Sequence, residues 1–226
     1  ISFMFYESLK YYTQVFMQAA QYPPMMERLN INEMIMRPLF NTMSFVAVLI
    51  LMPMLTMRVF SEEKKTGTIE LILTSPVKDW HVVLGKFFAA FSLFAIMIGL
   101  TIIYPLVLQL YGDPDWGPIW TGYIGLLLMG GSIITIGLFV SSLTENQIIA
   151  GVVCFGVALF LWSLDFASTT ISGQLGEVLG YLSVLRHYNT FEKGILDSTD
   201  CLFFLSFIYF GLFITVRSLE STRWRS

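Results

Sequence analysis

The side chains that could do chemistry are few and lie far apart along the chain. Neither His81 nor His187 has cysteine, histidine or carboxylate neighbours at metal-ligand spacing. Asp197 and Asp200 lie close enough in sequence to bind a cation together, although capping the helix that follows is the commoner role of such carboxylates. The sequence therefore predicts no metal site, and it favours a structural role for the two aspartates.

Motifs for nucleotide binding and nucleophilic catalysis are also missing. Gly85 and Lys86 are followed by Phe87, and no second glycine completes the phosphate-binding pattern G-x-x-x-x-G-K-[ST]. No serine lies in a G-x-S-x-G context, and no charge lies in the middle of an apolar run as a proton relay would need. We therefore expect no catalytic residue and no cofactor bound by this chain, and we disfavour a membrane enzyme or an ion-coupled transporter.

The densest block of charge runs from residue 58 to 86, RVFSEEKKTGTIELILTSPVKDWHVVLGK, between two apolar runs. A charged segment in that position must lie outside the hydrocarbon, because an unpaired charge is costly there. Thr66 or Thr68 can cap a helix that carries Glu70 in its first turn and ends before Pro76. The apolar positions of this helix are Ile69, Ile72 and Leu73. Such a face lies on a membrane or docks into a partner's groove, and a solvated loop that only sets topology is the alternative.

The composition is that of an integral membrane protein. Of the 226 residues, 55% are hydrophobic and only 13% are charged, with a mean hydropathy of +0.69. The net charge of -3, without a basic patch, argues against a nucleic-acid partner. Cys154 and Cys201 lie in apolar runs and are expected to be small core residues.

Apolar runs long enough to cross a bilayer predict an all-α polytopic fold with a single transmembrane domain. Five complete spans are expected at 39–57, 87–108, 119–140, 147–164 and 201–217. Residues 1–5 are expected to end a further, first span, and residues 6–38 to form an external segment with a short interfacial helix before Pro38. Residues 165–200 are expected to form an external amphipathic or re-entrant helix hairpin, with Asp165 closing the span before it. Pro53 is expected to kink the first complete span.

Small residues four apart in the 119–140 run predict close helix packing. The pairs are Gly131 with Thr135, and Gly137 with Ser141. Packing inside the subunit and a dimer or conduit face are both compatible with this pattern.

Two stretches resemble one family of membrane proteins. In the charged block, the order of Glu62, Glu63, Lys64, Gly67, Thr68, Glu70, Leu71, Leu73 and Pro76 resembles the cytoplasmic segment of ABC-2 type transporter permeases. Within that family it is most similar to the gliding-motility-associated permeases. The tract HYNTFEKGILDSTD, residues 187–200, resembles the same group just before its last span.

The resemblance implies a six-span exporter fold in which the 58–86 segment is a coupling element that contacts a separate ATPase subunit. Glu62 and Glu63 would contact basic residues of the ATPase, with Lys64 and Lys65 beside them. Gly67 would be the hinge at which the helix of Thr68 and Glu70 begins, and Ile69, Ile72 and Leu73 would enter the ATPase groove. ATP and Mg²⁺ would belong to that partner.

The further partners implied are a second permease copy or paralogue, the lipid bilayer and an accessory periplasmic membrane protein. The excess of Lys and Arg in the 58–86 segment and the C-terminal tail predicts that both lie in the cytoplasm. The resemblance implies a bacterial inner membrane. The expected function is export, or force transmission, driven by the partner ATPase. The alternative is a subunit that transmits force or assembles a cell-surface machine and passes no substrate.

Overall fold

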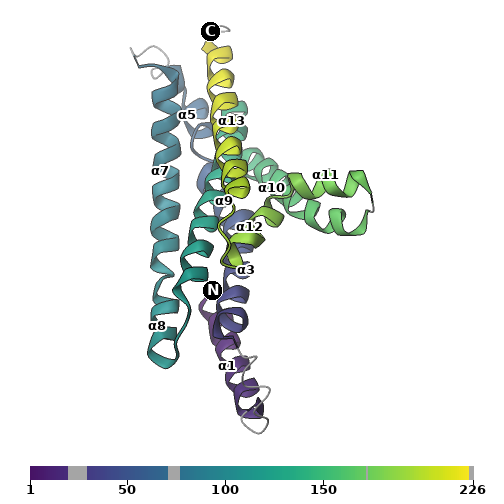
Figure 1. The fold of residues 1–226 in the computed structure, drawn as a ribbon. Helices are drawn as coiled ribbons and strands as arrows, with labels where there is room; N and C mark the ends of the chain where they lie inside the picture. Colours follow the sequence, from purple (N-terminus) through teal and green to yellow (C-terminus); the bar gives the residue numbers. More distant parts are fainter. Residues whose placement is uncertain (20–29, 71–76, 172, 224–226) are drawn as a thin grey trace.

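A computed structural model describes residues 1–19, 30–70, 77–171 and 173–223, and the regular structure in these ranges is entirely helical (Figure 1). Five helices in the described residues are long and apolar enough to cross a membrane. They cover Asn32–Thr66, Asp79–Leu110, Trp116–Leu143, Gln147–Thr170 and Ser198–Ser221. Each contains or largely overlaps one of the five expected spans, and most are longer than the apolar run alone.

The first of these helices is continuous where the sequence predicted a break. Within Asn32–Thr66, unbroken helix consists of η1 (Asn32–Met36), α3 (Arg37–Val46), η2 (Ala47–Leu51) and α4 (Met52–Thr56), and a turn and a short helix follow Thr56. η1 and η2 are π-helical turns, and each precedes a proline, Pro38 or Pro53. A proline ring clashes with the carbonyl four residues earlier, and each wide turn contains that carbonyl, at Met34 or Leu49. The residues before Pro38 are therefore helical as expected, but they are continuous with the first span and do not form a separate helix.

The N-terminal residues form a helix that is longer than the expected end of a span. α1 (Ser2–Ala19) packs against η1 and α3. The Ser2 and Tyr104 hydroxyls are 2.7 Å apart, and the rings of Phe5 and Tyr104 have centroids 5.0 Å apart. The polar stretch after residue 5 thus begins as helix, and the part from 20 to 29 lies outside the described residues.

Helix α9 (Trp116–Leu143) forms the centre of the bundle. It contacts α4, α7 (Asp79–Leu100), α10 (Gln147–Thr170) and α13 (Ser198–Arg223). Its small residues lie at these contacts: Gly131 faces Ile208 and Phe91, Thr135 faces Gly211, and Gly137 faces Thr56. Thr135 and Ser141 are fully buried. The predicted small-residue pairs therefore pack against helices of the same chain.

A hairpin of α10 and α11 (Gln174–Leu182) projects sideways from the bundle (Figure 1). α10 continues as helix past Asp165, which does not close the span as we expected. The sequence predicted one apolar face made of Leu175, Val178, Leu179, Leu182 and Leu185. Leu175, Val178 and Leu182 are exposed, Leu179 is half-buried, and Leu185 belongs to α12 and is buried, so this chain covers only part of that face.

Helix α12 (Val184–Glu192) is tied to its neighbours through His187. The Nδ1 atom of His187 lies 2.6 Å from Asp200 Oδ1, and its Nε2 lies 2.8 Å from the carbonyl oxygen of Tyr181. Its ring stacks on Phe203 with centroids 3.9 Å apart. Asp197 instead accepts a hydrogen bond from the Thr199 amide, at the start of α13. Of the two aspartates, Asp197 therefore caps the last span and Asp200 pairs with the histidine.

A methyl group on Gly137 should separate α4 from α9. A Cβ atom there would lie 1.9 Å from Thr56 Oγ1 and 2.4 Å from Thr56 Cβ, and Thr56 is itself fully buried. We expect Gly137→Ala to destabilise the protein by about 1–3 kcal/mol, measured as a lower melting temperature in detergent. Gly156→Ala is the matched control, because a Cβ atom added there would meet nothing within 4 Å. Equal effects of the two changes would show that the close approach at Gly137 is unimportant.

Candidate functional site

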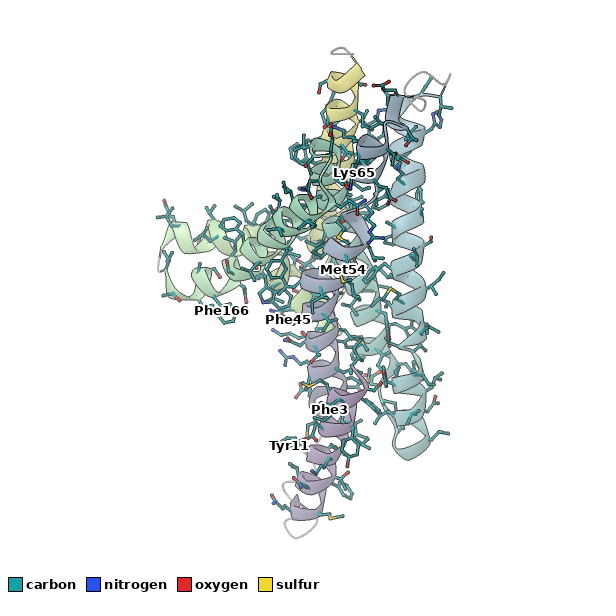
Figure 2. The ribbon with its side chains drawn as sticks, turned by 180° about the vertical axis from the view of Figure 1, so that it is seen from behind. Phe3, Tyr11, Phe45, Met54, Lys65 and Phe166 are labelled. Atoms are coloured by element: carbon teal, nitrogen blue, oxygen red, sulfur yellow. The ribbon has the colours of Figure 1, made fainter. Side chains whose placement is uncertain are left out.

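The charged segment after the first long helix forms a sharp bend, which we call the elbow, residues 57–67. The helix stops at Thr56, a turn occupies residues 57–60, and α5 (Ser61–Thr66) follows. The elbow lies at the same end of the bundle as the C-terminus, and α1 and α8 (Ile103–Tyr111) lie toward the opposite end (Figure 1). Lys65, labelled in Figure 2, marks this end of the molecule.

A serine from another helix caps the start of α5. The N-cap residue is Phe60, and its side chain makes no capping hydrogen bond. Instead, the backbone N–H groups of Phe60 and Ser61 both donate to Ser141 Oγ, each at 3.0 Å. The Ser141 hydroxyl lies 3.3 Å from the carbonyl oxygen of Met57, to which it donates. α9 thereby satisfies backbone groups that the bend removes from the helical ladder.

Lys86 fastens the other side of the elbow to α7. Its Nζ atom lies 2.6 Å from Glu63 Oε1 and donates to the carbonyl oxygen of Val59 at 2.5 Å. The same ammonium lies 4.6 Å from the ring centroid of Phe60, which is 1% exposed. Because the Lys86 and Glu63 side chains are only 19% and 28% exposed, solvent screens this pair less than a surface pair. The elbow is thus held by both α7 and α9.

Gly67 ends α5 in a conformation that other residues rarely adopt. Its φ of 72° is left-handed, and its N–H donates to the carbonyl of Lys64 at 3.2 Å. Helical geometry resumes at Ile69 and Glu70. Gly67 therefore separates two helical stretches, and the first of them, α5, lies before the helix start that we predicted at Thr66 or Thr68.

The predicted coupling residues fall into three groups. Glu62, Lys65, Thr66, Thr68 and Glu70 are exposed. Glu63 is half-buried through its pair with Lys86, and Lys64 is half-buried as well. Ile69 is 8% exposed and belongs to the hydrophobic core, so it is not part of a free apolar face. Ile72 and Leu73 lie outside the described residues.

Sequence reasoning missed the two residues that hold the elbow in place. Lys86 was considered only as part of an incomplete phosphate-binding motif, and Ser141 only as a packing residue. A single cation before a long uncharged run was the available signal for Lys86, because such a charge needs a partner near the interface. No comparable signal distinguished Ser141 from the other small residues of α9.

The described side chains of the elbow include no arrangement suited to bond making or breaking. No group of three or more histidine, cysteine or carboxylate side chains in the described ranges could hold a metal ion. The elbow presents an exposed, charged surface, and it is continuous with α4 and bonded to α7 and α9.

Long apolar helices around α9, with a charged elbow at one end, define the chain as a multi-pass membrane protein. It belongs to the ABC-2 family transporter proteins, whose family model it matches over residues 8–189. It is 26% identical over 137 residues to the probable multidrug ABC transporter permease YbhR of Escherichia coli strain K12, and equally to the same protein of strain O157:H7. That alignment covers 60% of this chain and 37% of each relative.

Removing the Ser141 hydroxyl should loosen the elbow. In Ser141→Ala, two buried backbone N–H groups lose their acceptor, at a cost of about 1–3 kcal/mol each. We expect faster amide hydrogen exchange at Phe60 and Ser61, by about fivefold or more. The control is Ser92→Ala, because Ser92 is exposed and donates only within its own helix. Unchanged exchange at residues 60 and 61 would contradict the capping role.

Proposed function

We propose that this chain is the transmembrane permease subunit of an ABC-2 type exporter, and that a separate ATPase binds the elbow. The observation that carries the proposal is the construction of the elbow, which is exposed on one side and locked to α7 and α9 on the other. Family membership supports the same assignment. ATP and Mg²⁺ are then bound and used by the ATPase, and the permease contributes the elbow, to which the ATPase binds.

The two faces of α5 divide these tasks. Glu62, Lys65 and Thr66 point outward and form a small surface of mixed charge on which an ATPase can dock. Glu63 and Ser61 face inward, toward Lys86 and Met57. A push on the outer face therefore acts through the inner face on α4, α7 and α9 together. Of the two glutamates first expected to contact the ATPase, Glu62 has the exposed position.

Export is the activity that the relatives favour. YbhR is described as a probable multidrug ABC transporter permease, and the spans of this chain lack charge in their middle sections. The cargo would then be an apolar or amphiphilic molecule. The working unit would contain a second permease copy or a paralogue in a bacterial inner membrane, with the elbow in the cytoplasm.

Reversal of one exposed charge tests the docking surface. We expect Glu62→Lys to reduce the amount of ATPase subunit that co-purifies with the permease, by about fivefold to tenfold. Glu177→Lys makes the same charge change at an exposed position of α11 and should leave co-purification unchanged. Equal recovery of the ATPase with both variants would argue against docking at the elbow.

A second function, force transmission to a cell-surface machine without transport, rests on the resemblance of residues 187–200 to gliding-motility permeases. A transport assay separates it from export. We expect vesicles that contain the permease with its ATPase to accumulate an amphiphilic dye in an ATP-dependent way. Lys86→Met should reduce dye accumulation more than it reduces binding of the ATPase. ATP hydrolysis without accumulation of any dye tested would favour force transmission.

A further inference from the structure

A cavity lies near the junction of η1, α9 and α12, away from the elbow. It measures about 110 Å³, and its lining includes Asn32, Asp115, Phe40 and Glu192. A wider hollow of about 580 Å³ adjoins it and shares Glu33, Arg37, Glu192 and Lys193 with it. We call the two hollows together the external groove.

The interior of the groove holds two acceptor atoms without a donor. Asn32 is 7% exposed, and its Nδ2 donates to the carbonyl of Asp115 at 2.6 Å, which leaves Oδ1 facing away from that bond. Neither Asn32 Oδ1 nor Glu192 Oε1 accepts a hydrogen bond in the described part of the chain, and both atoms are buried. A buried acceptor without a donor has lost its hydrogen bonds to water without replacement, so both oxygens favour a ligand that donates hydrogen bonds.

The rim of the groove carries two cations. Arg37 and Lys193 are exposed, and neither is within ion-pair distance of a carboxylate in the described ranges. Glu33 also lies at the rim. Arg37 and Lys193 act on Glu192 through their charges, from beyond ion-pair distance. The groove thus places acceptors inside and basic groups outside, which matches a ligand with a cationic donor group and a neighbouring anion.

The position of the groove points to a membrane ligand. Arg37 is the last charge before an uncharged run that continues to Met57, so the groove lies where the apolar part of the long helix begins. Trp116 and Trp120, with ring centroids 6.2 Å apart, lie beside Asp115 and Pro118 of the groove, and tryptophan favours the membrane interface.

An exposed apolar path leads away from the groove along the same helix. Thr42 lines the wider hollow, Phe45 one turn later is 46% exposed, and Met54 is 60% exposed. Phe45 and Met54 follow one another up this helix in Figure 2. An acyl chain that leaves the hollow would find apolar contacts along this path.

We propose that the external groove binds a phosphoethanolamine group, as carried by phosphatidylethanolamine. The primary ammonium donates to Asn32 Oδ1 and Glu192, and the phosphate pairs with Arg37 and Lys193. A quaternary ammonium has no N–H to donate, so phosphatidylcholine leaves both oxygens without a partner. The site is independent of the ATPase and of the elbow.

Ionisation of Glu192 should make ammonium binding at this site stronger as the pH rises. Burial raises the pKa of the Glu192 carboxyl to about 7, against the opposing charges of Arg37 and Lys193. An ammonium binds the ionised carboxylate better, and the ionised fraction rises about tenfold between pH 6 and pH 8 for such a pKa. Glu33, Arg37, Asp115 and Lys193 are the other charged groups that line the groove.

Lipid selectivity tests the proposal on the unaltered chain. Native mass spectrometry of the purified full chain, with phosphatidylethanolamine and phosphatidylcholine of identical acyl chains, should show at least about fivefold preferential retention of phosphatidylethanolamine. The preference should grow from pH 6 to pH 8. Equal retention of the two lipids, or stronger retention of phosphatidylglycerol, would overturn the proposal.

Variants and a soluble competitor complete the test. Glu192→Gln should lower phosphatidylethanolamine retention about tenfold and remove its pH dependence, and the exposed Glu177→Gln should change neither. Retention that is unaffected by Glu192→Gln would count against the site.

Free phosphoethanolamine that displaces the lipid would identify the headgroup as sufficient, and failure to displace it would assign the ligand to the membrane.

Discussion

Backbone polar groups that are buried away from water must find partners within the protein, and this constraint shapes the elbow at Phe60 and Ser61. The first long helix stops at Thr56, and the bend that follows exposes N–H groups that no helical ladder satisfies. The Ser141 hydroxyl accepts from two of them, and it can reach them only because Gly137, one turn earlier on α9, lets α4 approach closely. The small residues of α9 therefore make the exposed charged surface possible.

Length and hydropathy are local properties, and they predicted the spans well. The uncharged runs around Leu39, Phe87 and Gln147 each correspond to a long helix, because about twenty apolar residues leave few alternatives to a membrane helix. The continuity across Pro38 was missed, since proline usually ends a helix and the π turn that accommodates it leaves no simple sequence signal. The extension of α10 past Asp165 was missed for a similar reason, because a charge limits a span without ending a helix.

Contacts between distant residues could not be predicted. The pair of Lys86 with Glu63 requires the elbow to fold back on α7, and the burial of Ile69 requires the same bend. His187 and Asp200 were each described without the other, although they lie close in sequence, because the turn between α12 and α13 brings them together. The acceptors of the external groove come from η1 and α12, which only the tertiary fold joins. Hydrophobic periodicity indicates which face of a helix is apolar, but it does not indicate which other helix packs against that face.

The π turns η1 and η2 have a geometric consequence for the long helix between the external groove and the elbow. A π turn holds one residue more than an α turn. Each of the two therefore rotates the segment that follows it by about 100° about the helix axis, compared with an uninterrupted α-helix. The side chains of α3 therefore point in directions around the axis that an uninterrupted α-helix from Asn32 to Thr56 would not give them.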